Sequence, residues 1–139
     1  FLLAQLEARA EIQARRWRVW SRYASELRAW AAAHGVRLPV VPSHCEQPYH
    51  MFYLLMPSLE ARQTLIAHLR ARSIQAVFHY VPLHLSEMGR RFDARPGDHP
   101  VTEDLSQRLV RLPFYAGLTE PDQARVAGAV TEFNPGSGA

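Results

Sequence analysis

The chain has 139 residues, of which 47% are apolar and 21% are charged, and its formal net charge is +3. This length and composition are typical of one soluble globular domain with its own core, and they exclude a disordered chain. No apolar run approaches the roughly 20 residues that a membrane-spanning helix needs.

The basic residues are unusual, because all 16 are arginine and the chain contains no lysine. They form no basic tail, so we interpret them as a compositional bias rather than as a nucleic-acid signature. The single cysteine, Cys45, excludes an internal disulfide framework and is typical of a reducing compartment, so we expect a cytoplasmic protein. The first six residues lack the features of a signal peptide and an initiator Met, and we expect a larger parent protein.

Residues 2–33 are predicted to form one long helix, or two helices with a bend. Gly35 follows as a suitable C′ residue. Such a helix is about 45 Å long, so we expect it to pack on more than its own domain. Apolar residues recur in it at three- and four-residue steps, the period of a helix face: Leu6, Ala10, Trp17, Trp20, Ala24, Leu27 and Ala31.

The middle of the chain alternates between predicted strands and a helix. Apolar and aromatic residues favour a short strand over 36–42, a stronger one over 50–56 and a third over 74–81. Ser58 is a typical N-cap for a helix that ends near Arg72. The direction in which these strands pair stays open at this point.

The last third of the chain contains structure breakers and two further predicted helices. Thr102 is a candidate cap for a helix that ends near Val110, and 111–118 is rich in turns. Thr119 is predicted to cap a helix over 120–133, and 134–139 to form a disordered tail. Glycines and prolines predict an irregular stretch over 85–100: Gly89, Pro96, Gly97 and Pro100.

Titratable side chains are concentrated at the end of the third predicted strand. His79, Tyr80 and His84 flank Pro82, which ends the strand because proline donates no ladder hydrogen bond. Zinc binding is a weaker interpretation than scattered half-buried histidines, because the spacing of the candidate ligands matches no closed motif. Those ligands are His44, Cys45, His50, His79 and His84.

Two other chemistries are open to the sequence. Cys45 with His44 or His50 resembles a nucleophile and base, but no third group is present to orient the base. The main non-enzymatic alternative is a nucleic-acid-binding or protein-interaction module, because arginines alternate with aromatic residues in one stretch. That stretch contains Arg15, Arg16, Trp17, Arg18, Trp20, Arg22 and Tyr23.

Three ordered motifs resemble the C-terminal part of the DegT/DnrJ/StrS family of sugar-nucleotide aminotransferases. They are His50-Met51-Phe52-Tyr53, then Ala76-Val77-Phe78-His79-Tyr80-Val81-Pro82-Leu83-His84, then Arg111-Leu112-Pro113-Phe114-Tyr115-Ala116-Gly117-Leu118-Thr119. The spacing of Gly89 and Phe92 after His84 also fits. The resemblance covers nearly the whole chain except its tail.

This resemblance implies the small C-terminal domain, residues 1–133, of a fold type I enzyme that uses pyridoxal phosphate. We expect an α+β fold: a small, mostly antiparallel or mixed sheet covered by helices, with residues 1–33 as a long helix linking to a larger domain. The parent is expected to be a homodimer that transfers an amino group from glutamate to a nucleotide-linked 4-keto-6-deoxy sugar, with no nucleic-acid or membrane partner. That chemistry needs a lysine to hold the cofactor as a Schiff base, so we expect the chain alone to bind no cofactor and to be inactive.

The resemblance also implies which residues line the substrate site. We expect Tyr80 to contact the sugar nucleotide, His79 and His84 to support it by hydrogen bonds, and Arg111 to contact a phosphate or form a salt bridge. A histidine bonded only to backbone is an equal interpretation for His79. His50 and Tyr53 are interpreted as packing residues, and Trp17, Trp20 and Trp30 are expected to face the larger domain, leaving an apolar patch on the isolated chain.

Overall fold

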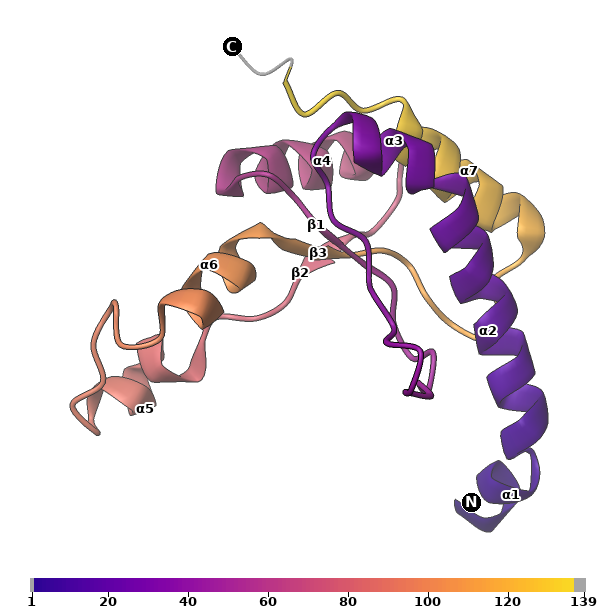
Figure 1. Cartoon of the computed structure of the whole chain (residues 1–139), viewed down its shortest axis with the longest axis horizontal. Coiled ribbons are helices and arrows are strands. Elements are labelled where there is room, and N and C mark those ends of the chain that lie inside the picture. The colour runs from indigo at the N-terminus through magenta and orange to yellow at the C-terminus, as the bar shows by residue number, and fades with distance from the viewer. Residues whose placement is uncertain (1, 137–139) are drawn as a thin grey trace.

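A small three-stranded sheet lies at the centre of the fold, and the structure, a computed structural model, describes residues 2–136 (Figure 1). The strands are β1 (Tyr53–Leu55), β2 (Val77–Phe78) and β3 (Leu109–Arg111). Strand β3 lies in the middle and pairs antiparallel with both neighbours. The predicted α+β class is therefore confirmed, with the described strands all antiparallel.

The predicted N-terminal helix is divided into three helices with bends between them. These are α1 (Leu2–Glu7), α2 (Arg9–Glu26) and α3 (Arg28–Ala33). Gly35 ends α3 as predicted: its φ is 65°, and the backbone N–H of Val36 donates to the carbonyl of Ala31 at 2.9 Å. A positive φ suits glycine because glycine has no Cβ to clash.

The helix caps that the sequence predicts are confirmed at two of three positions. Ser58 Oγ accepts from the backbone N–H of Ala61 at 3.1 Å and caps α4 (Leu59–Ala71). Thr119 Oγ1 accepts from the backbone N–H of Asp122 at 3.2 Å and caps α7 (Glu120–Thr131). The predicted cap at Thr102 is wrong, because α6 spans Pro100–Arg108 and Thr102 lies inside it.

The predicted strands are longer than the observed ones. Only three residues of 50–56 and two of 74–81 form strand. The predicted strand over 36–42 reduces to one bridge between Arg37 and Leu55. The stretch over 85–100, predicted to be irregular, contains α5 (Glu87–Arg90) directly after the 3₁₀ turn η1 (Leu83–Leu85).

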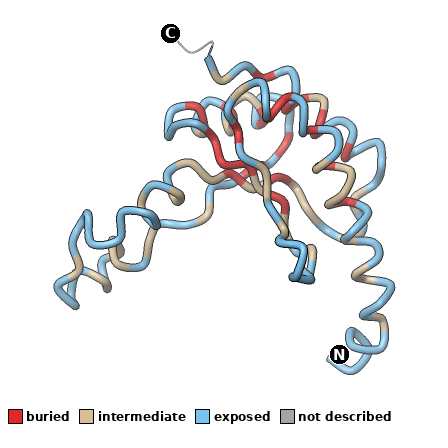
Figure 2. Tube along the Cα trace, viewed as in Figure 1, coloured by how far each residue is buried: buried red, intermediate tan, exposed pale blue. Residues whose placement is uncertain are grey.

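The core lies between the sheet and the helices above it in Figure 1, α3, α4 and α7, with the second half of α2 closing one side (Figure 2). Its largest fully buried side chains are Tyr23, Leu27, Phe52, Leu54, Met56, Leu65, Leu69, Val110 and Val130. The predicted apolar stripe is buried only beyond Val19, since Leu6 is 59% and Trp17 is 52% exposed.

Residues 79–108 project from the core as what we name the α5–α6 limb, seen at the lower left of Figure 1. None of these 30 residues is buried, and six of their large apolar or aromatic side chains are mostly exposed (Figure 2). The six are Tyr80, Val81, Leu83, Met88, Phe92 and Val101.

Two further predictions concern membrane-spanning helices and the C-terminal tail. None of the helices in the described part of the chain has the length and apolar character that crossing a membrane requires. Residues 137–139 of the predicted tail lie outside the described residues.

Candidate functional site

The strand register places Arg111 on the open face of the sheet. Arg111 pairs with Tyr53 of β1 and with Val77 of β2, so these three side chains lie on one face. The neighbouring Val110 points to the opposite face and is fully buried in the core. His79, two residues beyond Val77, reaches the side of Arg111.

Arg111 and His79 form the first contact of the candidate site. Arg111 Nη1 lies 3.1 Å from His79 Nε2 and 3.4 Å from His79 Nδ1, so the guanidinium is within hydrogen-bonding distance of both imidazole nitrogens. Burial first, and then the charge of Arg111, lower the pKa of His79. Both effects favour the neutral imidazole beside the guanidinium.

The Arg111 guanidinium has no carboxylate partner among the described residues. The Nε of Arg111 is buried and donates to no acceptor. The Nη1 of the same guanidinium contacts the imidazole of His79. Buried polar groups are normally hydrogen-bonded, and guanidinium is well shaped to bind carboxylate or phosphate. This region of the sheet therefore suits an anionic ligand.

Tyr80 directly follows His79 and is exposed to solvent. Its side chain is 69% exposed, and its ring centroid lies 3.3 Å from that of His79. An exposed phenol beside a neutral imidazole can donate or accept a hydrogen bond. Of the four predicted site residues, the structure thus brings His79 and Arg111 into contact, and Tyr80 lies beside His79 as its neighbour in the chain.

His84 lies apart from these three and belongs to a second cluster. Its Nε2 is 2.9 Å from Glu103 Oε1, and its ring contacts that of His99 at 4.6 Å between centroids. The His84 hydrogen bond, with the backbone N–H of Gly97, lowers the pKa of Glu103. Sequence reasoning missed Glu103, since a glutamate in a helix's first turn is usually only a solvated charge.

The other candidate residues are dispersed. His44, Cys45 and His50 are exposed, so the predicted packing role of His50 is wrong: it precedes β1 rather than lying in it. Tyr53 is half-buried on β1. No group of three His, Cys, Asp or Glu residues among 2–136 is arranged to hold a metal ion.

The arginine-rich stretch of α2 differs from an open nucleic-acid surface. Tyr23 is fully buried and Trp20 is half-buried against Phe52, with ring centroids 5.6 Å apart. Arg15 pairs with Glu11, and Arg22 pairs with Glu26. Trp17 is 52% exposed, in line with the expectation that it faces a larger domain.

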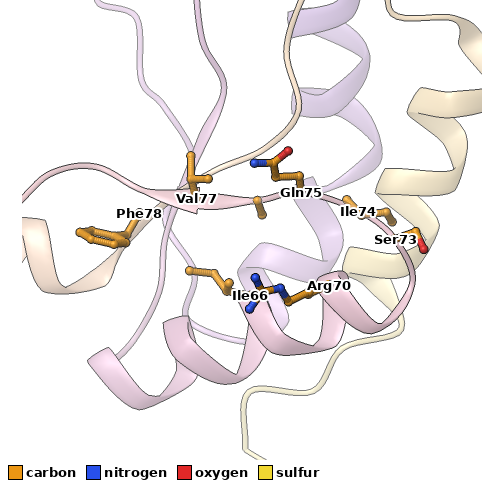
Figure 3. Close-up of a pocket in the computed structure, with 8 residues that line it drawn as sticks. Ile66, Arg70, Ser73, Ile74, Gln75, Val77 and Phe78 are labelled. Carbon is orange, nitrogen blue, oxygen red and sulfur yellow. The ribbon is translucent and has the colours of Figure 1, made fainter.

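A separate groove of about 520 Å³ lies between α4 and the free edge of β2 (Figure 3). Val77 and Phe78 line it from the strand, while Ile66 and Arg70 line it from the helix. Its lining includes none of the four predicted site residues. Phe78 pairs with Val110 and lies on the face opposite Arg111, with the Arg62 guanidinium 4.9 Å from its ring centroid.

The chain is similar to curated sugar transaminases over most of its own length. It is 32% identical over 111 residues to the dTDP-3-amino-3,4,6-trideoxy-alpha-D-glucose transaminase of Streptomyces venezuelae, an alignment that covers 79% of this chain and 28% of that protein. The protein with the same name from Micromonospora megalomicea subsp. nigra is 33% identical over 120 residues, covering 85% and 31%. The chain therefore spans under a third of the length of these relatives.

Solved structures show the same relation. A DegT DnrJ EryC1 StrS aminotransferase from Brucella abortus superimposes with a TM-score of 0.80 at 30% identity, covering 96% of this chain and 34% of that one. DesV of S. venezuelae, in complex with a ketimine intermediate, gives 0.78 at 33% identity, covering 94% and 33%. Residues 1–131 match one family over nearly the whole chain. The chain belongs to the DegT/DnrJ/EryC1/StrS aminotransferase family.

Proposed function

We propose that this chain forms one wall of the substrate site of a sugar-nucleotide aminotransferase. The observation that carries the proposal is the Arg111 guanidinium, which contacts His79, the chain neighbour of Tyr80, with its buried Nε unpaired. A nucleotide sugar has a diphosphate that can accept from Arg111 and sugar hydroxyls that can bond to Tyr80. Family membership supports this substrate class.

The three residues divide the binding work by their chemistry. Arg111 binds a phosphate oxygen, and its Nη1 also contacts the imidazole of His79. His79 supports the guanidinium through this contact, and Tyr80 presents a hydroxyl from an exposed position. His84 contributes through the position of the segment that joins it to Tyr80.

The residues of this chain do not fit covalent attachment of pyridoxal phosphate, the cofactor that the family implies. The cofactor would supply the amino-transfer chemistry from a lysine, and the chain contains no lysine. We therefore propose that the chain alone catalyses no transamination. The cofactor-binding lysine would come from sequence that the longer relatives possess.

The finer identity of the reaction is also part of the proposal. We propose glutamate as the amino donor, a nucleotide-linked 4-keto-6-deoxy sugar as the acceptor, and a cytoplasmic homodimer as the complete enzyme. The resemblance of the three motifs to dTDP-4-amino-4,6-dideoxygalactose transaminase remains a prediction. The names of the two curated relatives described above place the amino group at C3 of the sugar.

The test uses dTDP-glucose as a probe, titrated into the chain and followed by NMR shifts and calorimetry. Tyr80→Phe should weaken binding about fivefold by removing one neutral hydrogen bond, and Arg111→Ala should weaken it more than tenfold. Tyr115→Phe is the matched control, because Tyr115 is 55% exposed and lies outside the candidate site. Equal affinities for both tyrosine variants would contradict the role of Tyr80.

The same titration addresses the alternative function. A nucleic-acid-binding module should bind a DNA duplex with an affinity that falls steeply with salt, and it should ignore dTDP-glucose. Mutation of Arg15 or Arg18 should then weaken binding, whereas Arg111→Ala should not. That pattern would replace the proposed function.

A further inference from the structure

One carboxylate oxygen accepts three hydrogen bonds within the α5–α6 limb. Glu103 Oε1 accepts from His84 Nε2 at 2.9 Å, from the backbone N–H of Gly97 at 2.8 Å and from that of His99 at 3.5 Å. These bonds connect η1, the loop that follows α5, and the first turn of α6. The side chains of His84 and Glu103 are 10% and 17% exposed, in a limb that is mostly open to solvent.

The limb has few other means of keeping its shape. None of residues 79–108 is buried, so no apolar core fixes η1 against α6. The Glu87–Arg91 pair is strongly exposed, and such surface pairs contribute little. The Glu103 contacts, together with the packing of the His84 ring against that of His99, therefore link η1 to α6.

These contacts bear directly on Tyr80. The segment 79–83 joins β2, which is fixed by its pairing with β3, to His84, which is fixed by Glu103. The two ends of a segment only a few residues long determine the region that its side chains can reach. A displacement of His84 would therefore displace Tyr80 from the wall.

We propose that Glu103 is a positioning residue of the substrate wall: its Oε1 holds His84 and the Gly97–His99 loop, and so sets the position of Tyr80. This inference rests on the proposed function. Glu103 touches no substrate itself and acts through His84.

The test compares Glu103→Ala, Glu103→Gln and the control Glu87→Ala in the 139-residue chain. Glu103→Ala should speed amide hydrogen exchange at Gly97 and weaken dTDP-glucose binding by up to about fivefold, the effect expected for loss of the Tyr80 hydrogen bond. Glu103→Gln should have a smaller effect on exchange at Gly97 and on dTDP-glucose affinity, because the glutamine amide oxygen can still accept all three hydrogen bonds. Glu87→Ala removes an exposed carboxylate of the same limb and should change neither. Thermal unfolding should be unaffected in all three variants, since the core contains no residue of the limb.

Each outcome distinguishes the two proposals. Faster exchange at Gly97 with unchanged affinity would reduce Glu103 to a structural role and overturn the inference alone. Unchanged exchange at Gly97 in Glu103→Ala would also overturn it. A wild-type chain that fails to bind dTDP-glucose would overturn the proposed function, and the positioning role with it.

Discussion

Trp30 shows how one residue's role depends on what lies around it. It lies in the predicted N-terminal helix and is expected to face partly toward a missing domain, yet it is 7% exposed in this domain's own core. Its indole Nε1 donates to the carbonyl of Phe133 at 2.8 Å, across 103 residues of sequence. The expectation for Trp30 is therefore wrong, whereas Trp17 is exposed as expected.

Trp30→Phe should destabilise the chain by about 2 kcal/mol, because it leaves a buried carbonyl unpaired and opens a small cavity. Trp17→Phe is the control and should change the free energy of unfolding by less than about 0.5 kcal/mol. Urea denaturation followed by circular dichroism measures both. A cost for Trp17→Phe equal to that for Trp30→Phe would contradict this account.

The candidate site could be predicted only in part at the residue scale. The motif from Phe78 to His84 identifies the residues but not their partners. Arg111 is 32 residues from His79, and Glu103 is 19 residues from His84, so only the fold brings these side chains into contact. Local sequence patterns contain no information about such pairs when a single sequence is available.

At the scale of elements, helices are predicted better than strands. Ser58 and Thr119 mark helix starts because their hydroxyls satisfy N–H groups within the same turn. Strand β3 is missed and assigned to the end of a helix because its hydrogen bonds go to distant partners. Val110 of β3, for example, pairs with Leu54 of β1, which is 56 residues away in the sequence.

Two glycine substitutions should act oppositely on their elements. Gly128 lies in α7, and a Cβ there would meet no atom within 4 Å. Gly128→Ala should therefore stabilise the chain by about 1 kcal/mol through helix propensity, measured by thermal or urea unfolding. At Gly89 a Cβ would lie 2.6 Å from the His84 carbonyl oxygen and closer still to that of Leu83.

Gly89→Ala should therefore separate α5 from η1. Amide exchange at Phe92, whose N–H donates to the Gly89 carbonyl at 2.9 Å, should become faster. The unfolding midpoint of the core should stay unchanged, because the limb lies outside it. A stabilised limb in this variant would show that the close approach of Gly89 to η1 is not required.

At the scale of the whole molecule, most of the exposed apolar surface lies away from the three tryptophans, where the sequence predicts an apolar patch. It is concentrated on the α5–α6 limb and on α1, which project from the core in Figure 1. Leu83 is 87% exposed and Phe92 is 79% exposed. Exposed apolar groups of this kind mark surfaces that contact another molecule or domain.

The isolated chain should therefore bind a hydrophobic dye and self-associate as its concentration rises. Leu83→Glu combined with Phe92→Glu should lower dye fluorescence and the mean mass measured by light scattering. Val40→Glu is the control, since Val40 is 84% exposed but lies outside the limb. A wild-type chain that stays monomeric at high concentration and binds no dye would contradict this expectation.

The sequence by itself determined the α+β class, two of the helix caps, the family and the absence of a lysine. These features follow from local periodicity, short-range hydrogen bonds and motifs of adjacent residues. Only the tertiary structure decided the central place of β3, the burial of Trp30, the contact of Arg111 with His79 and the contacts of Glu103. Each of these depends on atoms that are distant in sequence, and they become neighbours only when the apolar core has formed.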